Sequence, residues 1–103
     1  TERFIRATYL RHQLRCSHNE DENLMNCFKV LESVSIPQGA VIDANKIHYT
    51  QYQLVMESKE RSYYIKPYFS NQIFKIKLTE DLLSKNEMTF LPINHELKIT
   101  SIQ

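Results

Sequence analysis

Arg3 is the residue whose position in this chain most needs a chemical explanation. It falls in the first turn of a predicted helix, within the apolar stripe that Ala7, Leu10 and Leu14 form at helical spacing. A cation there opposes the helix dipole and, on an apolar face, also loses hydration. Two interpretations are open: a buried structural ion pair with a carboxylate, or a guanidinium directed at a reactive centre in a cleft.

Thr1 is a second candidate for chemistry. Enzymes of the N-terminal nucleophile class use Thr, Ser or Cys as their first residue, with the free α-amine as base. A chain of 103 residues that starts at Thr could therefore be a matured catalytic subunit. Threonine is also a common N-cap residue in front of a helix, and this role explains Thr1 without any chemistry. We favour the N-cap interpretation.

The cysteines and histidines do not have the spacing of a metal site or a nucleophile pair. A site built from Cys16, His18 and Cys27 would need a fourth ligand, and the remaining histidines are not at zinc-like spacings. Two thiols are too few for a disulfide framework, so we expect small buried or half-buried thiols. His48 and His95 can titrate near neutral pH, but neither has an obvious nucleophile beside it. We expect structural or surface histidines.

Composition excludes several classes of partner. The formal net charge is +1, from 13 basic and 12 acidic residues, whereas a nucleic-acid-binding protein is expected to carry a basic stripe. No apolar run approaches the ~20 residues of a membrane span, and no secretory signal is visible. We therefore expect no nucleic-acid or membrane partner, and a cytoplasmic, bacterial location is the default without an export signal or disulfide pattern.

The elements that would position these residues are two helices and an antiparallel meander. Helical periodicity predicts one helix at about 2–15 and, after a break at 16–19, a second with an acidic first turn. An irregular connector then contains Gly39, which we expect at a positive φ or a close approach. The remaining predictions are strands at 47–56, 62–68 and 72–78, a capped helical turn at 79–83, and short terminal strands at 88–91 and 96–99. The fold class is α+β, with the helices on one face of the sheet.

Several segments in order resemble the carboxy-terminal third of the choloylglycine hydrolase family, the penicillin V acylases and conjugated bile salt hydrolases. The segments that carry the resemblance are Glu2–Arg6 (ERFIR), Ile36–Gly39 (IPQG), Tyr49–Tyr52 (YTQY), Tyr63–Tyr64, and Tyr68–Ile73 (YFSNQI). Each pattern is weak alone, but their order and spacing make a fairly specific signature. The resemblance extends over almost the whole chain and leaves the last fifteen residues unmatched.

The resemblance implies a partial αββα sandwich of the N-terminal nucleophile hydrolase type, with residues 1–103 as the C-terminal region of a single-domain enzyme. Its cysteine nucleophile would lie in an N-terminal catalytic part that is absent from this sequence. Arg3 matches the family's active-site arginine before Phe, so the resemblance implies that Arg3 holds the active-site network and stabilises charge during amide attack. The match departs at Glu2, where a small residue is expected.

The expected function is that of a C-terminal fragment of a cysteine amidase for linear amides such as penicillin V or conjugated bile salts, inactive alone. The implied partners are the rest of the same enzyme, a small-molecule amide substrate and further copies in a homotetramer. No metal or organic cofactor is implied. The alternative is a non-catalytic interaction module whose sheet edge or tyrosine face docks another protein.

Overall fold

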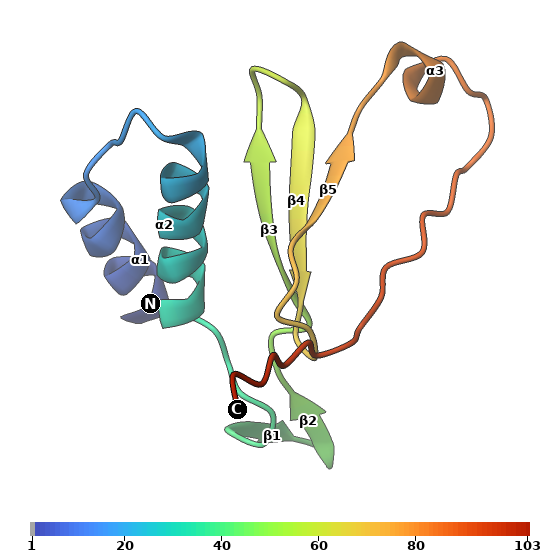
Figure 1. Cartoon of the computed structure of the whole chain (residues 1–103). Coiled ribbons are helices and arrows are strands. Elements are labelled where there is room, and N and C mark those ends of the chain that lie inside the picture. Colours follow the sequence, from blue (N-terminus) through green and yellow to red (C-terminus); the bar gives the residue numbers. More distant parts are fainter. Residues whose placement is uncertain (1) are drawn as a thin grey trace. The chain divides into compact units, whose positions relative to one another are not determined.

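The computed structural model describes residues 2–103, which form two compact units, 2–53 and 54–103. Thr1 itself lies outside the described residues, so its predicted N-cap role stays a prediction. Along the chain the elements are α1 (Glu2–Gln13), α2 (Glu20–Ser33), β1 (Val41–Asp43), β2 (Lys46–His48), β3 (Tyr52–Glu57), β4 (Ser62–Pro67), β5 (Phe74–Lys77) and α3 (Glu80–Leu83) (Figure 1). Within residues 2–103, no helix combines the length and apolar character needed to cross a membrane.

The first unit is built on the antiparallel helix pair α1 and α2, as the periodicity predicts (Figure 1). Asn19 begins α2 as its N-cap, because its side chain accepts hydrogen bonds from the backbone N–H groups of Asp21 and Glu22. The preceding loop is fixed by Asn23, whose carboxamide donates to the Ser17 carbonyl at 2.8 Å and accepts from the Ser17 N–H at 2.9 Å. These local bonds explain why the break in the pattern at 16–19 separates two helices.

The segment predicted as an irregular connector contains a two-stranded antiparallel hairpin, β1–β2, in which Ile42 lies opposite Ile47. Its two-residue turn puts Ala44 at φ 48° and Asn45 at φ 64°, the left-handed backbone that tight hairpin turns require. Because Lys46–His48 pair with β1, the strand predicted at 47–56 is wrong at its start and begins only at Tyr52. Alanine is a poor signal for such a turn, which is why the sequence pattern missed it.

Gly39 precedes this hairpin and has the positive φ that its sequence position predicts, at 97°. The close approach that was the other expectation is not found among the described residues, since beyond its chain neighbours a Cβ at Gly39 would meet no atom of residues 2–103 within 4 Å. Thr50 closes the segment by donating its N–H to the Ile36 carbonyl at 3.0 Å and accepting the Ile36 N–H on its hydroxyl at 2.8 Å.

The three-stranded meander β3-β4-β5 is confirmed, with β4 in the centre and antiparallel to β5. Pro67 ends β4, a position that suits proline because it cannot donate to a strand ladder. The turn between β3 and β4 is held by the Glu57 carboxylate, which accepts from the N–H groups of Lys59 and Glu60 at 3.0 and 2.6 Å. The α+β fold class follows from these elements, whereas the packing of the helices on one sheet face stays a prediction.

Residues after β5 form the capped helical turn but not the terminal strands. Thr79 is the N-cap of α3, as predicted. The predicted strands at 88–91 and 96–99 are wrong, because the tail pairs with side chains rather than with a strand. Asn71 exchanges two hydrogen bonds with the main chain of Lys98, and Gln72 donates to the Glu96 carbonyl at 3.3 Å.

The Arg3 site at the end of helix α2

Arg3 lies in the first turn of α1 and contacts the C-terminal end of α2. Its Nε donates a hydrogen bond to the Val34 carbonyl at 2.8 Å, and Arg6 donates from Nη1 to the neighbouring Ser33 carbonyl at 3.1 Å. The end of a helix carries carbonyls without intrahelical donors and a partial negative charge. Because α2 has no basic residue in its own last turn, the two arginines of α1 supply the positive charge there.

This arrangement corrects one of the two interpretations of Arg3. The side chain is exposed, and within residues 2–103 no salt bridge joins it to a carboxylate. The buried ion pair is therefore wrong for the described part of the chain. The reason is that a helix end, rather than a carboxylate, offsets the cost of a cation in the first turn of α1.

The remaining donors of Arg3 define what the site can do chemically. The Nη1 and Nη2 groups of Arg3 form no hydrogen bond or ion pair with any other residue in the described range 2–103. A guanidinium anchored through Nε keeps its plane while it presents these two groups to a carbonyl or carboxylate oxygen. The geometry is thus that of a partly fixed cation with open donors, which suits stabilisation of a developing oxyanion.

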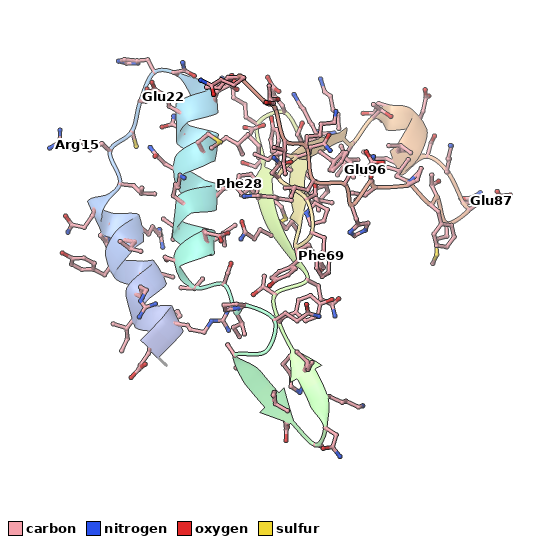
Figure 2. All side chains as sticks on the ribbon, turned by 60° about the horizontal axis from the view of Figure 1, so that its bottom comes forward. Arg15, Glu22, Phe28, Phe69, Glu87 and Glu96 are labelled. Carbon is pink, nitrogen blue, oxygen red and sulfur yellow. The ribbon has the colours of Figure 1, made fainter. Side chains whose placement is uncertain are left out.

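The sequence pattern did not single out Arg6 as a site residue. The available signal was the i, i+3 spacing of Arg3 and Arg6, which puts both side chains on neighbouring turns of one helix face. A contrast comes from Arg15, in the loop that joins the helices, which Figure 2 shows pointing outward. Within the described residues, its side chain makes no hydrogen bond or salt bridge.

The other candidates do not come together into a site. Cys16 and Cys27 are free and exposed, so the expectation of buried or half-buried thiols is wrong. Cys27 turns outward because the next residue, Phe28, takes the buried position on α2, with 4% exposure. His48 and His95 are exposed, and within residues 2–103 no group of three or more His, Cys, Asp or Glu is placed to hold a metal ion.

A second cluster of charges lies on the meander. Lys75 stands directly opposite Tyr64 in the β4–β5 register, with Nζ 5.7 Å from the ring centroid and 3.6 Å from the Glu60 Oε2. The electrostatic interaction and hydrogen bond with Tyr64, followed by the Glu60 carboxylate, raise the pKa of Lys75 above its ordinary value of 10.5. Lys75 is exposed, and it joins the cluster through one ion pair and one cation–π contact.

The chain matches known proteins over most of its length. The family model for linear amide C–N hydrolases of the choloylglycine hydrolase family matches residues 1–91. Two crystal structures of the conjugated bile acid hydrolase from Clostridium perfringens, a cysteine-to-alanine mutant and an arginine-to-leucine variant, are similar in fold. Each has a TM-score of 0.74 and 24% sequence identity. Both matches cover 98% of this chain and 31% of the crystal-structure chain, so the chain spans about a third of their length.

Proposed function

Because this chain belongs to the choloylglycine hydrolase family of linear amide C–N hydrolases, we propose that it is the C-terminal part of a longer enzyme that hydrolyses linear amides. The rest of that enzyme would supply the cysteine nucleophile at its N-terminus. The similarity in fold to a conjugated bile acid hydrolase supports conjugated bile salts as one substrate class, with penicillin V as the other. In this proposal the chain by itself is inactive.

The proposed reaction is nucleophilic acyl transfer. The α-amine accepts the thiol proton, the cysteine sulfur forms a bond to the amide carbonyl carbon, and the carbon–nitrogen bond breaks as the α-amine passes that proton to the leaving amine. Water then attacks the acyl-enzyme and releases the acid. Negative charge gathers on the carbonyl oxygen in both steps, and the free Nη groups of Arg3 are the donors that we assign to the network around it.

The observation that carries this role is the attachment of Arg3 through Nε alone. The bond to the Val34 carbonyl fixes the guanidinium, and the site lies within the residues that the family model matches. A purely structural arginine would be expected to use its paired Nη groups as well, since the bidentate fork is its strongest mode of binding. The open donors therefore favour a ligand outside residues 2–103.

The test is made in the longer protein that carries this chain, with Arg3→Gln compared with Arg15→Gln. We expect the Arg3 variant to lose about 10²–10³ in kcat on penicillin V or a glycine-conjugated bile salt, the size of effect of one oxyanion donor. The Arg15 variant should match the parent, because its side chain makes no bond within the described residues. Intact kcat with a lowered melting temperature for Arg3→Gln would assign the residue a structural role instead.

The fragment status has its own test. The isolated chain should release no amine from any linear amide, and measured turnover by residues 1–103 alone would contradict the proposal. The longer protein should be active and, as we also propose, tetrameric by light scattering. If the longer protein hydrolyses neither substrate, the amidase proposal fails.

A non-catalytic interaction module is the second candidate, and exposed apolar side chains are the observation in its favour. On α1, Phe4, Ile5 and Tyr9 are 75%, 61% and 63% exposed, and the hairpin pair Ile42 and Ile47 is 66% and 52% exposed. Such surface calls for a covering partner. The chain spans about a third of the similar structures, so we take the rest of the same enzyme as that partner. Monodisperse, cooperative folding of the isolated chain would favour the module.

A further inference from the structure

We propose that Arg6 is a positioning residue for Arg3: by binding the Ser33 carbonyl, it fixes the end of α2 so that the Val34 carbonyl holds the Arg3 guanidinium in one orientation. The expected effect of Arg6 on kcat rests on the proposed function. The geometric coupling between the two arginines stands on their hydrogen bonds and is tested separately.

The first step is the matched spacing of donors and acceptors. Arg3 and Arg6 are three residues apart, which separates them by roughly 4.5 Å along α1 and leaves them on one face. Their acceptors are the carbonyls of two consecutive residues, Val34 and Ser33. Two bonds between the same pair of helices fix their axial register, because a shift of α1 by one residue would break both.

The second step is that the Ser33 carbonyl needs a donor from outside its helix. The residue four positions later is Pro37, which has no backbone N–H and so cannot make the regular helical bond. The Val34 and Ser35 N–H groups instead bond the carbonyls of Leu31 and Glu32. The Arg6 guanidinium therefore meets a carbonyl that the helix itself leaves open.

The third step concerns orientation. Within residues 2–103 Arg3 is held by one hydrogen bond through Nε, so the direction of its open Nη groups depends on where the Val34 carbonyl lies. Arg6 binds the adjacent peptide unit and limits the movement of that carbonyl. Without Arg6 we expect the Arg3 side chain to sample other rotamers, and a small loss of alignment at a reacting centre lowers kcat more than KM.

The experiment uses Arg6→Gln, Arg6→Lys and the control Arg15→Gln in the longer protein. We expect Arg6→Gln to lower kcat about tenfold with KM nearly unchanged. Arg6→Lys should recover part of the loss, because an ammonium can still donate to the Ser33 carbonyl. In protein labelled with ¹⁵N-arginine, the Arg3 Nε–H signal is assigned by its loss in Arg3→Gln. The Arg3 Nε proton should exchange faster with water in Arg6→Gln than in the parent, and at the parent rate in Arg15→Gln.

Several results would overturn the inference. An unchanged Arg3 Nε–H signal in both Arg6 variants would show that the arginines are not coupled, even if activity falls. An unchanged kcat in Arg6→Gln, with an active parent, would overturn the positioning role and leave the proposed function standing. A parent without amidase activity would remove the proposed function, and the Nε–H exchange rates would still decide the coupling. Arg6→Lys supplies the same readouts if Arg6→Gln does not fold.

Discussion

The Asn71 carboxamide and the Lys98 peptide unit are joined by two hydrogen bonds of opposite sense. Asn71 Nδ2 donates to the Lys98 carbonyl at 2.6 Å, and the Lys98 N–H donates to Asn71 Oδ1 at 3.0 Å. The side chain thus satisfies a main-chain donor and acceptor in the way that a neighbouring strand would. Together with Gln72, which donates to the Glu96 carbonyl, Asn71 attaches the tail to the loop between β4 and β5 without adding a strand.

Replacement of Asn71 by Leu should release the tail. Both bonds are lost, and at ~1 kcal/mol for each bond the amide of Lys98 should exchange with solvent about thirtyfold faster. Hydrogen exchange followed by mass spectrometry measures this. The control Asn86→Leu removes an exposed asparagine that makes no side-chain bond within residues 2–103. Equal exchange at Lys98 in the two variants would contradict the attachment.

Lys75 should hold its proton above pH 10.5. The electrostatic interaction and hydrogen bond with Tyr64 are the largest causes of its raised pKa, and Glu60 adds to them. A raised pKa in the folded state stabilises the fold fully below 10.5, and this contribution disappears as the pH rises through the folded-state pKa. In an NMR titration of ¹³C-methylated lysines, Tyr64→Phe should lower the pKa of Lys75. The same change at Tyr63, whose side chain points to the other sheet face, should leave it unaltered.

Gly39→Ala should destabilise the protein by about 1–2 kcal/mol, the cost of a left-handed backbone for a residue with a Cβ. Backbone strain is the cause, because φ is 97° and, among the described residues beyond its chain neighbours, a Cβ would contact nothing within 4 Å. Urea denaturation of the longer protein measures the loss. Gly39→Asn should cost less, since asparagine tolerates positive φ. If alanine were as stable as glycine, the backbone at this position would have to differ from the one described.

Asn19→Ala should cost about 1 kcal/mol in the free energy of unfolding, because α2 loses its N-cap. The Asn19 Oδ1 accepts from the N–H groups of Asp21 at 2.9 Å and Glu22 at 3.3 Å. Asn26→Ala, in the middle of the same helix, is the matched control and should be neutral or slightly stabilising by helix propensity. A loss of equal size at both positions would argue against the cap.

The elements that sequence periodicity predicts well are those fixed by local rules. Both long helices, the turn capped by Thr79 and the meander follow from apolar spacing and capping residues. The hairpin β1–β2 was not predicted, because its turn residues Ala44 and Asn45 do not include the glycine that usually marks such a turn. The terminal strands were overpredicted because alternation at 96–99 does not reveal that a side chain, Asn71, takes the place of a partner strand.

The site was predictable only in part. The sequence singled out Arg3 through the cost of a cation in a first helical turn, and this cost is real. The Val34 carbonyl offsets this cost. It lies 31 residues away and belongs to the backbone, so no residue type in the sequence indicates it. The role of Arg6 was hidden for the same reason, although Pro37 four residues after Ser33 marks a carbonyl in need of a donor.

The strand pairing also sets the order in which the parts of the fold form. Each ladder joins strands that are neighbours along the chain, β1 with β2 and β3 with β4 with β5, so each can form within microseconds of its own residues becoming available. The ties between Arg3 and Val34 and between Asn71 and Lys98 span 31 and 27 residues. During synthesis these two long-range contacts form after the segments that they join have folded, so the orientation of Arg3 is fixed only once α2 has emerged from the ribosome.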